Sequence, residues 1–180
     1  MLKKVILAAV VIAAGMFGYT KIMARAGSGD PPPALALDQQ VDEIRVEKKK
    51  RKMTLLRDGQ VLQVYDISLG RDGNGGHKQR EGDQKTPEGS YVIDWRNPNS
   101  MAHLSLHISY PNAQDQKAAD AAGYSPGGNI MIHGLPNGWG WLASVHHLWD
   151  WTDGCIAVTN AEMREIWAKV PNGTPIIIAP

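Results

Sequence analysis

Cys155 and His133 are the two residues whose types and neighbours most directly suggest catalysis. Cys155 follows Gly154, and His133 ends a short apolar run and precedes Gly134. A thiol with a pKa of about 8.5 is only slightly ionised at neutral pH, and an imidazole within hydrogen-bond reach raises its reactivity and later protonates a leaving group. Two strand ends at the same edge of a sheet would bring these side chains together. The spacing alone is a weak signal, because any cysteine and any histidine can be paired on paper.

The absence of a second cysteine excludes an internal disulfide and leaves two interpretations of Cys155. Free cysteines are often inert, buried core residues. In an oxidising compartment a lone thiol is a liability, so the other interpretation is a functional nucleophile. The residue count by itself does not separate the two.

Gly154 adds a second element of acyl-transfer chemistry. A residue without Cβ lets a carbonyl substrate approach the backbone N–H groups around Cys155. Those groups would hold the oxyanion of a tetrahedral intermediate, which is typically worth about 3 kcal/mol per donor.

Short apolar clusters predict strands on both sides of this pair. The dipeptide Asp58-Gly59 is a strong hairpin turn signal between two of these clusters. Thr159 and Glu162 have the spacing of a capping box and predict a helix, and residues 112–122 suggest a second one. We therefore predict a mainly β, α+β fold with one or two helices.

His103 and His107 are separated by four residues, which on a helix would suit a metal ion. The apolar and polar residues of 103–109 alternate with period two, which predicts a strand instead. No HExxH motif and no cluster of cysteine and histidine supports zinc, so we expect no metal.

Four tryptophans gather in the aromatic, glycine-containing loop 135–151. Core packing explains some of them, while stacking on a sugar or covering an acyl-enzyme is the functional alternative. They are Trp139, Trp141, Trp149 and Trp151.

The charge pattern argues against nucleic acid as a partner. The chain of 180 residues has 19 basic and 18 acidic side chains and a net charge of +1, so it has no whole-protein field that attracts phosphate. Its one basic run, residues 48–52, lies between apolar alternations. A solvated hairpin tip or edge strand is the expected structure, and contact with an anionic wall or membrane surface is the alternative.

The N-terminus predicts export from the cytoplasm. Lys3 and Lys4 precede an uncharged run, Val5–Thr20, and an Ala-Arg-Ala site follows at residues 24–26. We expect residues 1–26 to be a signal peptide or an N-terminal membrane anchor, 27–40 a linker containing three consecutive prolines, and 41–180 the catalytic domain. The domain would then lie in the periplasm or elsewhere in the cell envelope.

Three segments together resemble the signature of L,D-transpeptidases of the YkuD type. Residues 130–134 (IMIHG) look like the family's strand ending in a histidine, and residues 150–157 (DWTDGCIA) like its Ser/Thr-x-Gly-Cys motif, in the branch with Asp-Trp-Thr-x-Gly-Cys-Ile-Ala. Residues 82–89 (GDQKTPEG) resemble its Thr-Pro-x-Gly segment. The resemblance runs from about Ile44 to Ile178, and this combination in this order is specific.

The resemblance implies a sandwich-like or barrel-like β domain that forms a cysteine acyl-enzyme on peptidoglycan stem peptides, at a bond following meso-diaminopimelate. Cys155 matches the nucleophile and His133 the base, with the Gly134 carbonyl orienting the imidazole. The backbone of Gly154 and Cys155 would hold the oxyanion. No metal or organic cofactor is implied.

Two positions depart from the family pattern and bear on the substrate contacts. Asp153 stands where many members have histidine, and Ala157 stands where many have an arginine or asparagine that helps to hold the substrate. Asn160 would take over that contact, unless the substrate differs. We expect Asp153 and Asn160, together with His107 and Trp151, to bind substrate.

Three functions stay open at this level. The leading one is a peptidoglycan L,D-transpeptidase of cell-wall biogenesis and cell shape, which passes the acyl group to a second stem peptide or to an outer-membrane lipoprotein. A hydrolase using the same site, either an L,D-carboxypeptidase or an amidase that releases wall-bound lipoprotein, is the second. The third is a wall-binding module with a silent site, against which the intact His133-Gly134 and Gly154-Cys155 pairs argue.

Overall fold

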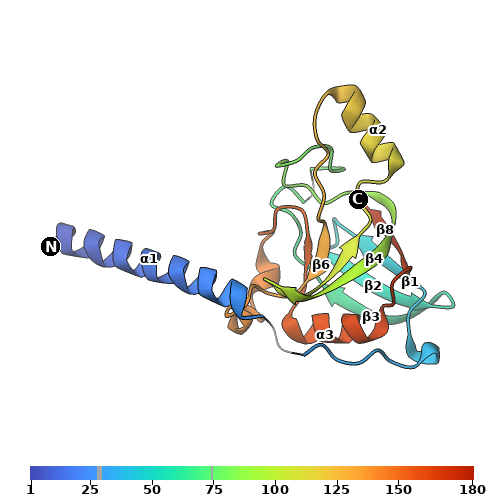
Figure 1. The fold of residues 1–180 in the computed structure, drawn as a ribbon, viewed down its shortest axis with the longest axis horizontal. Helices are drawn as coiled ribbons and strands as arrows, with labels where there is room; N and C mark the ends of the chain where they lie inside the picture. The colour runs from blue at the N-terminus through green and yellow to red at the C-terminus, as the bar shows by residue number, and fades with distance from the viewer. Residues whose placement is uncertain (28–29, 74) are drawn as a thin grey trace.

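The computed structural model describes residues 1–27, 30–73 and 75–180, so residues 28–29 of the expected linker lie outside the described residues. The domain is built on one curled sheet (Figure 1). The sheet has eight strands among the described residues, in the order β3-β2-β1-β8-β4-β5-β6-β7. The strands are β1 (Glu43–Glu47), β2 (Lys52–Arg57), β3 (Gln60–Asp66), β4 (Gly89–Ser100), β5 (His103–Ile108), β6 (Met131–His133), β7 (Ile156–Ala157) and β8 (Pro175–Ala179). The helices are α1 (Leu2–Ala26), α2 (Ala113–Ala122) and α3 (Asn160–Lys169), with short 3-10 turns η1 (Leu37–Gln39), η2 (Gly140–Leu142) and η3 (His146–Leu148).

One half of the sheet is built from local hairpins closed by the last strand. β2 and β3 pair antiparallel across Asp58 and Gly59, which both have positive φ, as a tight hairpin turn requires. β8 lies between β1, to which it is parallel, and β4, to which it is antiparallel. The two ends of the folded chain are therefore joined at the centre of the sheet.

The other half carries the site. β4 is shared between the halves, since residues 89–92 pair with β8 and the rest of the strand pairs with β5. β5 pairs antiparallel with β6, and β6 pairs parallel with β7. Buried side chains from both halves form one core, which α3 completes with Met163, Ile166 and Trp167.

The predicted α+β class is confirmed, and both predicted helices are present in the domain. α3 begins with the predicted capping box of Thr159 and Glu162, and α2 begins with an equivalent box of Asn112 and Asp115. The third helix, α1, covers the segment that the sequence predicts to be a signal peptide or a membrane anchor.

The basic run 48–52 corrects one expectation. Residues 48–51 form the turn between β1 and β2, and Lys49 and Lys50 are exposed as expected of a hairpin tip. Lys48 is instead fully buried, and its ammonium donates to the carbonyl oxygens of Gly76 and Thr86 and to Glu88 Oε1 at 2.8–2.9 Å. A lysine can be buried only where all its donors are satisfied, which composition does not reveal.

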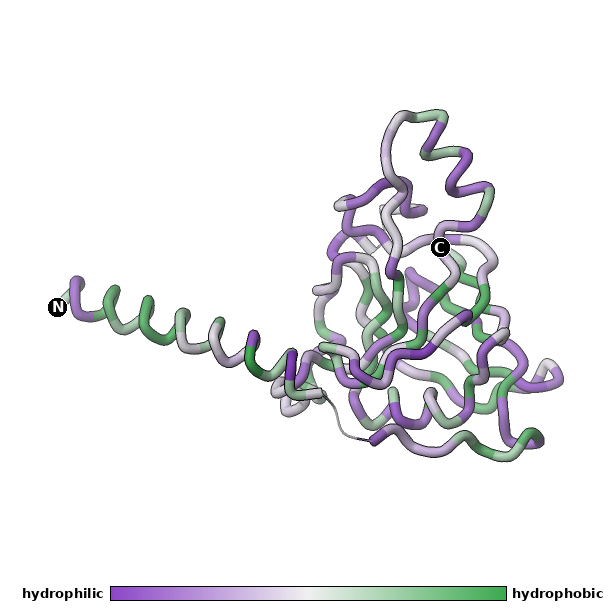
Figure 2. Tube along the Cα trace, viewed as in Figure 1, coloured by the Kyte–Doolittle hydropathy of each residue, from purple (hydrophilic) through white to green (hydrophobic). Residues whose placement is uncertain are grey.

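α1 projects away from the domain and buries none of its residues (Figures 1 and 2). Among the described residues it is the one helix long and apolar enough to cross a membrane, by length and composition. A signal sequence passes the same test.

Candidate active site

Cys155 and His133 line one cleft, which has a volume of about 550 Å³. β6 and β7 run parallel with Ile132 opposite Ile156, and Cys155 lies one residue before β7. Paired residues on neighbouring strands project to the same face, and side chains alternate along each strand. Cys155 therefore projects from the same face as His133.

The way in which the two side chains come to line one cleft differs from the expected one. His133 ends β6 and Cys155 precedes β7, and in parallel strands these positions are at opposite ends. The side chains share a cleft because the strands are only three and two residues long. The shortness of β6 and β7, and not a shared edge of the sheet, therefore brings Cys155 and His133 into one cleft.

One hydrogen bond fixes the tautomer of His133. Nδ1 lies 2.6 Å from the carbonyl oxygen of Gly134, which can only accept, so Nδ1 carries the proton. Nε2 then holds a lone pair and can accept a proton. Trp151 packs edge-on against the imidazole, with ring centroids 5.7 Å apart, and fixes the plane of the ring.

Both groups of the pair are held in their neutral forms. Burial lowers the pKa of His133, and the bond to Gly134 only partly offsets this effect. Burial raises the pKa of Cys155, against the opposing effect of the Met131 N–H, which lies 3.4 Å from Sγ. The site at rest therefore contains a thiol and a neutral imidazole, and ionisation has to accompany attack on a substrate.

Gly154 is required by close backbone packing. Its φ is +128°, and a Cβ at this position would lie 2.7 Å from the carbonyl oxygen of Lys85. Its own N–H donates to Thr152 Oγ1 at 3.2 Å, and that hydroxyl donates to the Cys155 carbonyl at 2.7 Å. The N–H of Gly154, which was expected to face the substrate, is thus engaged within the turn.

Two of the four expected substrate-binding residues line the cleft. Trp151 forms part of its wall beside His133. Asp153 lies at the rim, is exposed, and has Oδ1 3.4 Å from Arg71 Nη1.

The other two lie beside the cleft and have protein partners. His107 Nδ1 is 2.6 Å from Asp94 Oδ1, and its ring stacks on Trp95 with centroids 4.9 Å apart. Asn160 begins α3, and its Oδ1 accepts from the Leu135 N–H at 2.8 Å. In the described residues, neither side chain belongs to the cleft lining.

Sequence reasoning did not single out Thr152 and Ser105 as residues of the site. Thr152 holds the turn before Cys155 through its hydroxyl, and the Thr-x-Gly-Cys spacing could have identified it. Ser105 pairs with His133 across β5 and β6 and lines the cleft. The alternation that placed His107 on one face also placed Ser105 there.

The part of the chain that the structure describes has no group of three or more histidine, cysteine or carboxylate side chains that could hold a metal ion. The lining of the cleft includes the Cys155 thiol and the His133 imidazole.

A family model for the L,D-transpeptidase catalytic domain, YkuD, matches residues 42–178. The chain belongs to this family.

Its relatives agree with the assignment. An Escherichia coli protein, YafK, whose name assigns it as an L,D-transpeptidase, is 34% identical over 134 residues, which are 71% of this chain and 46% of the relative. This chain therefore spans about half the length of that relative. Among solved structures, Bdellovibrio bacteriovorus Bd1075 has a TM-score of 0.55 at 25% identity, covering 84% of this chain and 52% of the other. A variant of the helical cell shape determining protein Pgp2 from Campylobacter jejuni has a TM-score of 0.56 at 25% identity, covering 88% and 53%.

In this L,D-transpeptidase domain, the Thr-Pro segment, residues 82–89, packs against the turn that carries Cys155. Thr86 Oγ1 accepts from the Gly70 N–H at 3.1 Å. A Cβ on Gly70 would lie 2.9 Å from the Cα of Gly154, so the three segments pack backbone against backbone. The position of Cys155 thus depends on residues more than 60 positions earlier in the chain.

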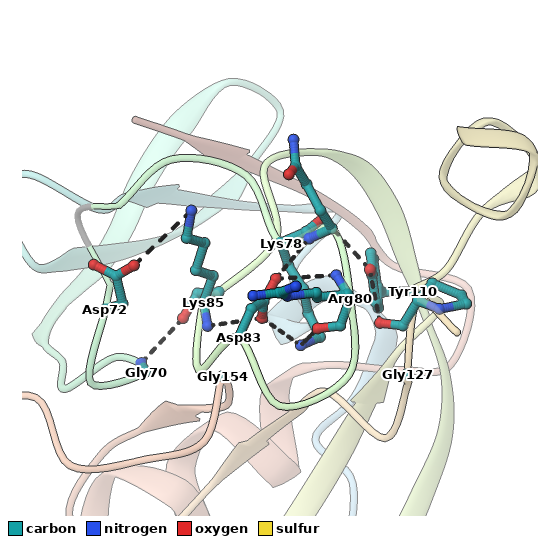
Figure 3. A network of polar contacts seen from close by, with 12 residues as sticks. Gly70, Asp72, Lys78, Arg80, Asp83, Lys85, Tyr110, Gly127 and Gly154 are labelled. Carbon is teal, nitrogen blue, oxygen red and sulfur yellow. Dashed lines mark hydrogen bonds and ion pairs between the residues drawn. The ribbon is translucent and has the colours of Figure 1, made fainter. Parts of the chain in front are cut away.

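Asp83 organises the loop that precedes this segment (Figure 3). Its carboxylate accepts from Lys78 Nζ at 2.8 Å and from the N–H groups of Gln79, Arg80 and Lys85 at 2.8–3.1 Å. Burial alone would raise the pKa of Asp83, but these bonds together lower it to about 2. The ionised carboxylate therefore holds Lys85, and with it the carbonyl that packs on Gly154.

This network predicts an acid-sensitive contribution to stability. The folded-state pKa of Asp83 lies below its unfolded value of about 3.9, so the contribution is complete above that pH and is lost as the pH falls through about 2. Asp83→Asn should lower the free energy of unfolding at neutral pH by about 2 to 3 kcal/mol, because it also leaves Lys78 buried without its counter-ion. Urea unfolding at pH values above and within this window measures both effects.

Asp72→Asn is the matched control, since Asp72 is exposed and lies 3.9 Å from Lys85 Nζ. Its effect should stay within about 0.5 kcal/mol. Equal stabilities of Asp83→Asn and wild type at neutral pH would contradict the role given to this carboxylate.

Proposed function

We propose that this chain is a peptidoglycan L,D-transpeptidase that acts outside the cytoplasm through an acyl-enzyme on Cys155. The observation that carries the proposal is the hydrogen bond from His133 Nδ1 to the Gly134 carbonyl, in the cleft that Cys155 lines. It leaves Nε2 as a proton acceptor on the face from which the thiol projects.

The first half of the reaction forms a thioester. As Sγ of Cys155 adds to the carbonyl carbon of diaminopimelate in a donor stem peptide, its proton passes to His133 Nε2. The N–H of Cys155 is the donor proposed for the oxyanion, because the N–H of Gly154 is bonded to Thr152. The C–N bond then breaks, and the imidazolium gives its proton to the leaving amine.

The second half transfers the acyl group. An amine of a second stem peptide, or of an outer-membrane lipoprotein, loses its proton to His133 and attacks the thioester. Sulfur leaves and recovers the proton, which restores the neutral pair. Water attacking in place of the amine would give hydrolysis with the same residues, so the acceptor alone distinguishes a transpeptidase from a carboxypeptidase or amidase.

The relatives support both the reaction class and its biological setting. The family to which the chain belongs is named for the transpeptidase activity, and one structural relative is named as a determinant of helical cell shape. The apolar α1 agrees with an export signal or an anchor. We therefore propose a role in cell-wall biogenesis and cell shape at the cell envelope, in the periplasm.

Cys155→Ala should abolish turnover of purified muropeptides while leaving the melting temperature almost unchanged, because the side chain is only half-buried and small. Mass spectrometry of the wild-type products identifies the function: cross-linked stems indicate a transpeptidase, and trimmed stems indicate a hydrolase. Untouched muropeptides with folded wild-type protein, or full activity in Cys155→Ala, would reject the proposal.

His133→Ala should slow alkylation of Cys155 by iodoacetamide at neutral pH, because the thiol loses the base that accepts its proton. The difference should shrink as the pH rises, since the raised pKa of Cys155 places direct ionisation at alkaline pH. The rates are read by intact-protein mass spectrometry.

His147→Ala is the control for this experiment, because His147 is exposed, whereas His146 is buried and bonded to Ser68. It should alkylate at the wild-type rate. Identical pH profiles for wild type and His133→Ala would remove His133 from the catalytic pair.

A carbapenem should acylate Cys155 once, because its strained amide resembles the acyl donor and the site supplies a thiol, a base and an oxyanion donor. Intact-protein mass spectrometry should show one adduct on wild type and none on Cys155→Ala. Folded wild-type protein that forms no adduct, with its thiol confirmed reduced, would favour a silent wall-binding module. An adduct that forms and then disappears would favour the hydrolase.

A further inference from the structure

The loop between His133 and the Cys155 turn exposes a cluster of large apolar side chains. Residues 134–149, here called the indole loop, contain no aspartate, glutamate, lysine or arginine. Trp141 is 71% exposed, Leu148 67% and Trp149 51%. A cluster of this kind on a soluble surface usually marks contact with a partner or a membrane.

The indole loop is bonded to the end of α1. Tyr19 donates from its hydroxyl to the Gly138 carbonyl at 3.1 Å, and Trp139 Nε1 donates to Thr20 Oγ1 at 3.2 Å. The rings of Tyr19 and Trp139 meet edge to face with centroids 6.0 Å apart. Gly138 has φ +83°, and a Cβ there would lie 2.7 Å from Tyr19 Oη and from Met23 Cγ. The loop is shaped to accept the helix closely, which favours an α1 that stays attached to the domain.

The length of the apolar run in α1 determines how deep the indole loop would lie in a membrane that α1 spans. Val5–Thr20 is 16 residues, which as a helix rises about 24 Å, somewhat less than a hydrocarbon core of about 30 Å. Lys4 and Lys21 flank the run, so a spanning α1 uses all of it. Tyr19 and Thr20 then lie at the boundary with the headgroups, and any segment bonded to them lies at the same depth.

Two independent features therefore agree. The position of the indole loop on α1 puts it at the lipid boundary, and its composition is the one that this boundary favours, because the amphipathic rings of tryptophan and tyrosine concentrate there. Lys3 and Lys4 at the start of α1 place the N-terminus on the cytoplasmic side, so the loop would meet the outer leaflet.

We propose that α1 is retained as a membrane anchor and that the indole loop docks on the outer surface of the phospholipid bilayer that α1 spans. Thr20, Lys21 and Ala24 line the cleft together with Cys155. Docking therefore holds the mouth of the cleft at the membrane surface. The proposal concerns where the domain sits and does not depend on acyl transfer.

The tryptophans allow a direct test in the full chain. All six lie in the domain and none in α1, so quenching by brominated lipid reports on the domain alone. In vesicles of phosphatidylethanolamine and phosphatidylglycerol, lipid brominated near the headgroups should quench more emission than lipid brominated near the bilayer centre. Trp141→Phe combined with Trp149→Phe should lower the quenched fraction by roughly half or more, because the docked indoles are gone.

Trp95→Phe is the matched control, because it removes an exposed indole from β4 and should leave the quenched fraction equal or higher. A quenched fraction that is negligible, or that the double variant leaves unchanged, would overturn the proposal and leave the cluster to a protein partner. The mass of the protein recovered from cell envelopes tests the retention of α1. The mass of the intact chain supports the proposal, and the mass of a chain that starts after Ala26 would overturn it.

Discussion

The shortness of β6 and β7 is the constraint on which the rest of the site depends. A strand of three residues beside one of two has few ladder hydrogen bonds of its own, so its register has to be held from outside. β7 is also bonded on the edge that faces away from β6. There Ser68 and Ala157 exchange both backbone hydrogen bonds at 2.8–2.9 Å. Leu69 and Arg71 then bond the backbone of Thr152 on either side. Segment 68–71 thus acts as an extra strand for the nucleophile turn.

Charged side chains next to these backbone contacts favour one arrangement of the loops around Cys155. Lys48 reaches the Thr-Pro segment, Asp83 gathers the N–H groups of the loop before it, and Arg51 Nη2 lies 2.7 Å from Asp150 Oδ2 at the start of the Cys155 motif. Removing one partner of such a buried or half-buried pair is costly, because it leaves the other charge desolvated and without its counter-ion. The geometric demands of these pairs are also strict, and they exclude other loop packings. The backbone of Gly154 packs so closely on the carbonyl of Lys85 that only one packing of the two loops allows it.

The local rules of sequence predicted most of the frame. The Asp58-Gly59 hairpin and the α3 capping box follow from backbone preferences that act over a few residues, and the structure has both. The burial of Lys48 and the engagement of the Gly154 N–H by Thr152 depend on segments far apart in the chain. Residue type and spacing carry no information about such contacts. His107 is another example of a contact that the sequence does not reveal. The alternation of residues 103–109 predicted the face of the strand on which His107 lies, but its partner, Asp94, comes from the neighbouring strand β4.

The neutral resting pair also bears on the two interpretations of the lone cysteine. An exported thiol that ionised freely would be open to oxidation, because the thiolate is the form that oxidants attack. Burial raises the pKa of Cys155, which keeps the protonated form dominant at neutral pH. In the proposed mechanism the thiol loses its proton only when a carbonyl carbon is within reach, since His133 Nε2 takes the proton as the C–S bond forms. The burial that raises the pKa of Cys155 is therefore compatible with a nucleophile, because it protects the resting thiol from oxidation without removing it from the cleft.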